Sequence, residues 1–176
     1  HAATNVQEYK EKGFTSRVIL NYLSLLGWNP DSDKEIFDEN ELINSFQFKQ
    51  VQKKSAVFDE KKLLWISQQH LSEMSVRDLM NEIYALNPEW GDGLEWEYLK
   101  EVVKLIKDRS KTITEIASMS EIFFTDKLDY DSDLLNKTYN DKSIAIIKDF
   151  KSALTSIEDW SRVELENIFK NLMEQH

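Results

Sequence analysis

Apolar residues recur at helical spacing along most of the chain, and this periodicity restricts the possible folds more than any other feature. From Thr15 to Leu26 they fall at i, i+4, i+7 and i+8, so one face of a helix would bury them. Similar spacing after Ser75 predicts a helix ending before Pro88 and further helices at about 94–108, 112–124, 131–139, 142–156 and 161–174. Only four glycines and two prolines interrupt the 176 residues. We predict a mainly all-α fold.

The segment between about residues 31 and 59 is the least regular part of this pattern. Asn40 is expected to cap a short helix ending near Phe46, and Asp59 to cap a longer one. Val51 and the alternation over 56–58 leave room for one or two short strands. The sequence therefore predicts a mainly helical region at 1–72 and a purely helical region at 73–176.

Composition excludes several classes of site. The chain has no cysteine, which removes disulfides, thiolate metal sites and cysteine nucleophiles. His70 is the only internal histidine, so neither a histidine-based triad nor a histidine-rich metal site can form. No apolar run approaches the length of a membrane span. We expect a cytoplasmic chain with no catalytic residue, no metal, no cofactor and no membrane contact.

The basic residues are more informative than the net charge of −10, because that charge is an average over the chain. The window 100–111 has a net charge of +3, and so has the window 49–62. The candidate RNA-binding residues in these windows are Lys53, Lys54, Lys100, Lys104, Lys107, Arg109 and Lys111.

The four lysines of the window 100–111 would share one helix face if the helix continues through Lys111. Arg109 lies where that helix should end, and its planar guanidinium could bind a phosphate or a base edge there. The alternative is a solvated helix face whose lysines pair with Glu97 and Glu101.

Several sequence blocks also follow one another in a specific order. They read GF at 13–14, NYLSLLGWNP at 21–30, EIF at 35–37, AVFD at 56–59, KL at 62–63, FF at 123–124 and YD at 130–131, with Trp65, Trp160, Val163 and Leu165 between and after them. Together these blocks resemble the bacterial glutamyl-tRNA synthetases, which are class I aminoacyl-tRNA synthetases. The opening residues HAATNVQEY resemble the segment that follows the ATP-binding loop in that family.

The resemblance implies that 1–72 is a stem-contact region and 73–176 an all-helical anticodon-binding domain, incomplete at its C-terminus. The catalytic domain, with its ATP and Mg, would lie upstream of this chain. The whole enzyme would attach L-glutamate to tRNA(Glu) using ATP, and it could also accept tRNA(Gln). We expect it to be a monomer.

The resemblance also suggests a role for one residue. Arg109, ahead of Thr112–Ile116, matches a family arginine that lies near the third anticodon base. An alternative function from another class is a helical protein-interaction module with an acidic surface. Substitution of Lys104 and Lys107 would then leave partner binding intact.

Overall fold

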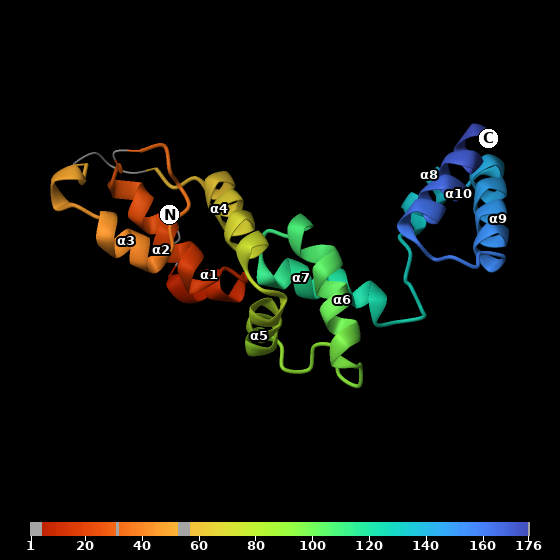
Figure 1. The fold of residues 1–176 in the computed structure, drawn as a ribbon, viewed down its shortest axis with the longest axis horizontal. Helices are drawn as coiled ribbons and strands as arrows, with labels where there is room; N and C mark the ends of the chain where they lie inside the picture. Colours follow the sequence, from red (N-terminus) through yellow and green to blue (C-terminus); the bar gives the residue numbers. More distant parts are fainter. Residues whose placement is uncertain (1–4, 31, 53–56, 176) are drawn as a thin grey trace. The chain divides into compact units, whose positions relative to one another are not determined.

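The computed structural model describes residues 5–30, 32–52 and 57–175, and these residues are mainly helical (Figure 1). The predicted all-α class is confirmed. The chain divides into two compact units, His1–Asp126 and Lys127–His176. The predicted boundary between residues 72 and 73 falls inside the first unit and remains a prediction about family regions.

The first half of the first unit contains four helices, each with a side chain that caps its N-terminus. They are α1 (Val6–Glu11), α2 (Ser16–Gly27), α3 (Glu39–Ser45) and α4 (Glu60–Glu73). Asp59 caps α4 as predicted, by accepting the Lys62 N–H at 3.1 Å. The prediction that Asn40 caps α3 is wrong. Asp38 does so, because Glu41 completes a reciprocal capping box with it.

In the described part of the chain, a single isolated β-bridge takes the place of the expected strands. Trp28 and Val51 form an isolated antiparallel bridge, while Val57 and Phe58 belong to no strand. Ala56, the other residue of the predicted alternation, lies outside the described residues. The bridge closes the long connection between α2 and α4, which includes α3 and a 3-10 turn at Phe48–Gln50.

The second half of the first unit packs three helices together: α5 (Val76–Leu86), α6 (Trp96–Ile106) and α7 (Ile113–Ser120). Two 3-10 turns follow α6 and α7, at Lys107–Arg109 and Glu121–Phe123. Ser75 caps α5 and Thr112 caps α7, each by accepting the N–H of the residue three positions later. These local hydrogen bonds fix where each helix begins.

Helix α4 connects the two halves because it contributes to both of their cores. Its Leu63 and Ile66 pack with the apolar face of α2, where Val18 and Tyr22 are buried. Its Leu71 instead belongs to the core formed by α5, α6 and α7. One helix thus contributes buried side chains to both cores, and this sharing explains why the first unit extends to Asp126.

A second connection joins the turn after α1 to the start of α7. The Gly13 carbonyl accepts the Ile113 N–H at 2.9 Å, and the Lys12 carbonyl accepts the Thr114 hydroxyl at 2.8 Å. Gly13 has φ +83°, and a β-carbon placed on it would lie 2.5 Å from the Thr114 nitrogen. Only glycine permits both this backbone conformation and this close approach.

The second unit contains α8 (Ser132–Thr138), α9 (Asp141–Thr155) and α10 (Arg162–Gln175). Helices α9 and α10 pack on each other, with Phe150 and Phe169 in edge-to-face contact at 6.5 Å. Among the described residues of the second unit, Leu172 is the most deeply buried apolar side chain. Across the described ranges of both units, no helix combines the length and apolarity needed to cross a bilayer.

Candidate nucleic-acid interface

Two of the candidate lysines are already paired with acidic neighbours on the same helix. Lys100 forms an ion pair with Glu97 at 3.0 Å, and Lys104 forms one with Glu101. Both pairs join residues three positions apart on α6. The alternative interpretation, a solvated helix face whose lysines pair with glutamates, therefore describes Lys104 well. The positive charge available to bind a polyanion is smaller than the net charge of the window 100–111 suggests.

Lys107 has a structural contact that the sequence did not indicate. Its ammonium donates to the carbonyls of Ser72 at 2.8 Å and Met74 at 3.2 Å. These carbonyls lie at the end of α4, where the last turn of a helix leaves acceptors without helical donors. A cation at this position also interacts favourably with the helix dipole. Lys107 thus fastens the turn after α6 to the end of α4.

The face shared by the lysines does not extend to Lys111. Helix α6 ends at Ile106, a 3-10 turn follows, and Ser110 adopts an extended conformation. Lys111 lies beyond this break, with its side chain exposed and its backbone N–H donated to Glu115. The condition that the helix continues through Lys111 is not met, so Lys111 belongs to the entry into α7.

Arg109 is exposed at the end of this 3-10 turn, and its side chain is free of hydrogen bonds and ion pairs among the described residues. It borders a hollow of about 360 Å³ whose other walls are Leu105, Ile106, Met119, Ile122 and Phe123. Ser110 is fully buried, and its hydroxyl donates to the Ile106 carbonyl at 3.1 Å, which closes the turn that presents Arg109.

The wall of the hollow opposite α6 is held in place by Tyr98. Its hydroxyl donates to the Phe123 carbonyl at 2.7 Å. An unpaired guanidinium can donate two parallel hydrogen bonds to a base edge or a phosphate. The apolar side chains beside it can contact the flat face of a base. This arrangement is chemically suited to a nucleotide.

The remaining basic candidates contribute less. Lys53 and Lys54 lie outside the described residues. Of the other lysines in the window 49–62, Lys49 and Lys61 are exposed, and Lys62 pairs with Glu35. Lys62 therefore has a local partner, as Lys100 and Lys104 have.

Sequence reasoning missed an aromatic residue among these cations. Trp96 lines a hollow of about 350 Å³ together with Arg77, Met80 and Lys100. The i, i+4 spacing of Trp96 and Lys100 was a usable signal, because residues at this spacing share a helix face. Arg77 comes from α5, so the sequence alone could not place it there.

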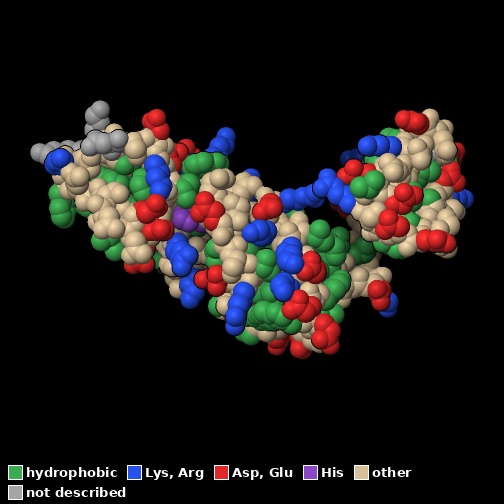
Figure 2. All heavy atoms as spheres, viewed as in Figure 1, with side chains coloured by type: hydrophobic (Ala, Val, Ile, Leu, Met, Phe, Trp, Pro, Cys, Tyr) green, Lys and Arg blue, Asp and Glu red, His purple; other side chains and the backbone are tan. Residues whose placement is uncertain are grey.

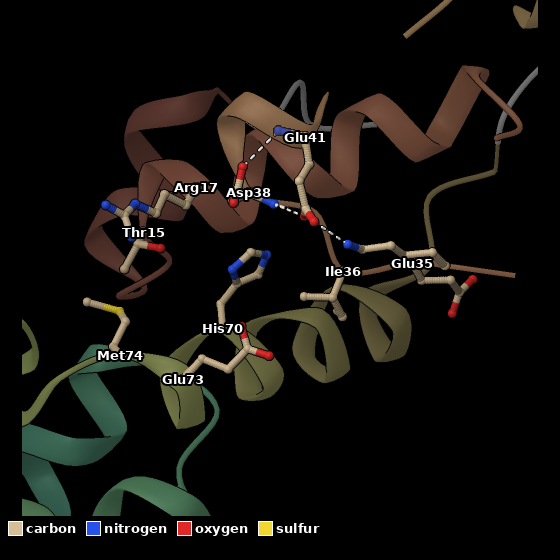
Figure 3. Close-up of a pocket in the computed structure, with 10 residues that line it drawn as sticks. Thr15, Arg17, Glu35, Ile36, Asp38, Glu41, His70, Glu73 and Met74 are labelled. Carbon is tan, nitrogen blue, oxygen red and sulfur yellow. Dashed lines mark hydrogen bonds and ion pairs between the residues drawn. The ribbon is translucent and has the colours of Figure 1, made fainter. Parts of the chain in front are cut away.

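A larger hollow of the first unit lies elsewhere, between α3 and α4 (Figure 3). It measures about 590 Å³ and is lined by both signs of charge, with Arg17 and Lys34 facing Asp38, Glu41 and Glu73. The capping box occupies the first two of these carboxylates, and Lys34 pairs with Glu41 at 2.5 Å. Asp38, Glu41 and Lys34 thus satisfy one another and hold the connection between α2 and α4.

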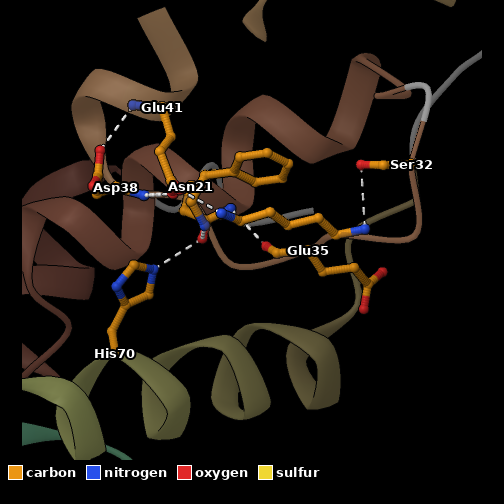
Figure 4. A network of polar contacts seen from close by, with 8 residues as sticks. Asn21, Ser32, Glu35, Asp38, Glu41 and His70 are labelled. Atoms are coloured by element: carbon orange, nitrogen blue, oxygen red, sulfur yellow. Dashed lines mark hydrogen bonds and ion pairs between the residues drawn. The ribbon is translucent and has the colours of Figure 1, made fainter. Parts of the chain in front are cut away.

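His70 belongs to the same network (Figure 4). The Asn21 amide donates to the Glu35 carbonyl at 3.0 Å, while its oxygen accepts the Phe37 N–H at 3.0 Å. That oxygen faces His70 Nε2 at 2.8 Å, so Nε2 is the protonated ring nitrogen. Burial lowers the pKa of His70 below its ordinary value, and the charge of Glu73 partly opposes this effect. His70 therefore has a packing role.

Within the described residues, the acidic and histidine side chains form no group of three that could hold a metal ion. The expected absence of metal and of catalytic residues stays a prediction.

The helical fold is similar to that of two solved structures. The structure superposes on a glutamate tRNA ligase from Elizabethkingia meningosepticum with a TM-score of 0.76 and 24% identity, covering 95% of this chain and 33% of that one. A glutamate-tRNA synthetase from Elizabethkingia anophelis gives a TM-score of 0.73 over 96% of this chain and 33% of that one, also at 24% identity. At this identity the likeness establishes the fold.

The sequence defines the family more closely. The chain belongs to the anticodon binding domain family, whose model matches residues 74–176. Residues 1–65 match the model of the class I tRNA synthetase (E and Q) catalytic domain. The chain is 33% identical to glutamate–tRNA ligase 2 of Caldicellulosiruptor saccharolyticus over 99% of its length, and 33% identical to glutamate–tRNA ligase of Flavobacterium johnsoniae over 92%. It spans 37% and 32% of these two relatives.

Proposed function

We propose that this chain is the tRNA-binding, anticodon-recognising part of a bacterial glutamate–tRNA ligase. The observation that supports this function most strongly is the anticodon binding domain match over 74–176, since Arg109 and its apolar hollow lie inside that range. The relatives that match nearly the whole chain are named glutamate–tRNA ligases. The chain would bind and position tRNA for a reaction that takes place elsewhere in the ligase.

Within this proposal, Arg109 contacts an anticodon base. Its guanidinium has no competing partner among the described residues, so no internal ion pair must break before RNA binds. A lysine whose charge is compensated, such as Lys104, gains less from the same contact. We therefore rank Arg109 first among the seven candidates and place Lys100, Lys111, Lys53 and Lys54 after it.

The complete ligase would attach L-glutamate to tRNA(Glu), and the same surface could also accept tRNA(Gln). ATP and Mg would bind to residues outside this chain. We propose that the ligase acts in the cytoplasm as a monomer. An anticodon reader must bind tRNA in every catalytic cycle, so tRNA affinity is the property to test.

The test is Arg109→Ala in the complete ligase, with aminoacylation measured at varied tRNA. Loss of a bidentate base contact costs about 1–3 kcal/mol, so kcat/KM for tRNA should fall by about 5- to 100-fold. Arg109→Lys keeps the charge but loses the planar fork, and should recover only part of the loss. Calorimetric binding of ATP and of glutamate should not change.

Arg162→Ala is the matched control, because Arg162 is exposed and already bonded to Glu166 at 2.7 Å. An equal loss in ATP or glutamate binding would contradict the assignment of Arg109 to tRNA. A ligase that binds no tRNA would contradict the proposed function as a whole. That second result would favour the protein-interaction module.

A further inference from the structure

A second hollow of the first unit combines an aromatic ring with two cations. It lies between α5 and α6, and its lining residues are Arg77, Met80, Trp96 and Lys100. Figure 2 shows Lys and Arg side chains beside hydrophobic ones over this part of the chain. Its volume of about 350 Å³ lies within the range of ligand sites in proteins. Met80 is fully buried, so the hollow has an apolar wall.

Trp96 is both exposed and held in a fixed orientation. It is 44% exposed, so part of its ring is accessible to a ligand. Its ring stacks on Tyr84 with centroids 6.3 Å apart and planes 11° apart. Tyr84 in turn packs edge to face against the buried Trp90 at 5.5 Å. An indole supported in this way needs little further ordering before a second ring stacks on it.

The charges at this hollow favour an anion. The Arg77 side chain is exposed and has neither a hydrogen bond nor an ion pair among the described residues. Lys100 shares its charge only with Glu97, whose side chain is 75% exposed. Asp78, next to Arg77, accepts the Ser75 hydroxyl at 2.7 Å at the start of α5. Two cations thus face the hollow from two helices.

We propose that this hollow binds one unpaired nucleotide of the tRNA, with the base stacked on Trp96 and the adjoining phosphate held by Arg77 and Lys100. This inference rests on the proposed function and adds a second contact to it. Bases inside an RNA helix are already stacked, so an aromatic side chain can bind only a nucleotide from a loop, bulge or end. A planar ring next to an anionic group is the chemistry that this hollow matches.

The proposed nucleotide differs from the one assigned to Arg109. Trp96 begins α6 and Arg109 follows its end, and a helix of 11 residues is about 16 Å long. One nucleotide cannot reach both sites. The two hollows would therefore hold different parts of the same RNA, and substitutions in them should act independently.

The test measures tRNA binding by the complete ligase in a salt titration. Stacking of a base on an aromatic side chain predicts that Trp96→Ala lowers the affinity by about 5- to 100-fold, whereas Trp96→Phe keeps most of it. Arg77→Ala and Lys100→Ala should each reduce the slope of log K against log salt by about 0.7. Ultraviolet crosslinking should join the Trp96 peptide to an unpaired nucleotide of the tRNA.

Trp160→Ala and Arg162→Ala are the matched controls, since Trp160 is 64% exposed and Arg162 is exposed and paired with Glu166. Both should bind tRNA like the wild type. Arg77→Ala removes no internal bond among the described residues, so it tests the site even if Trp96→Ala weakens the fold. Unchanged affinity and salt slope in the Trp96 and Arg77 variants, or a crosslink to a paired nucleotide, would overturn this inference while wild-type binding still supports the proposed function.

Discussion

The substitution Gly13→Ala tests whether the contact between the α1–α2 turn and α7 holds the first unit together. Gly13 has φ +83°, and an added β-carbon would lie 2.5 Å from the Thr114 backbone nitrogen and 2.8 Å from its hydroxyl oxygen. The backbone conformation alone costs an L-residue about 1–2 kcal/mol. The overlap is with backbone, so a rotamer change cannot relieve it, and the turn must move away from α7.

That movement breaks the two hydrogen bonds of the contact, from Ile113 to Gly13 and from Thr114 to Lys12. Each is worth about 0.5–1.5 kcal/mol net. Alanine restricts the unfolded chain more than glycine does, and this effect raises the free energy of unfolding by about 0.4–1 kcal/mol. We expect Gly13→Ala to lower the free energy of unfolding by about 2–4 kcal/mol.

Two other glycines provide matched controls. Gly93 has φ +77° but no neighbour within 4 Å of an added β-carbon, so Gly93→Ala tests the backbone conformation alone. It should cost no more than about 1 kcal/mol. Gly27 is helical and equally open, so Gly27→Ala should stabilise the chain by about 0.5–1 kcal/mol.

The assay is urea denaturation followed by tryptophan fluorescence, because four of the five tryptophans lie in the first unit. A loss below about 1 kcal/mol for Gly13→Ala, equal to that of Gly93→Ala, would refute the argument from close approach.

Two further predictions concern the polar contacts of α4. Because burial lowers the pKa of His70 below its ordinary 6.5, the unfolded chain binds a proton more readily than the folded one, so the urea midpoint should fall as the pH drops from 7 towards 5. His70→Gln should make the urea midpoint depend less on pH. A variant with the same pH profile as the wild type would contradict the assignment of this dependence to His70. Lys107→Met should cost about 1 kcal/mol by removing the donor to Ser72 and Met74, whereas Lys104→Met should stay within about 0.5 kcal/mol in the same urea assay. Equal effects would mean that the Lys107 contact is energetically neutral.

The sequence predicted features that depend on local interactions. The cap at Asp59 and the end of α6 before Arg109 both involve residues a few positions apart. The correct cap of α3 could have been found in the sequence. Asp38 precedes Glu41 by the three residues of a capping box, whereas Asn40 does not. Helix α1 was not predicted, although Asn5 and Glu8 have the same spacing.

Features that depend on distant residues could not be predicted. Lys107 looks like one more lysine on a helix face, because the carbonyls that it binds lie 33 and 35 residues earlier in the chain. Val51 pairs with Trp28 in a bridge whose existence depends on the path of the chain through α3. Arg77 joins Trp96 only because α5 packs against α6.

The contact between Lys12 and Thr114 also has a consequence for the time at which the chain can fold during synthesis. The two residues are 102 positions apart. A ribosome adds about 5–20 residues per second, so the turn after α1 would wait about 5–20 s for its partner to be made. Contacts between residues so distant in sequence slow the search for the native state. Until α7 leaves the ribosome, the carbonyls of Lys12 and Gly13 lack their hydrogen-bond donors, and this turn is open to chaperones and proteases for that interval.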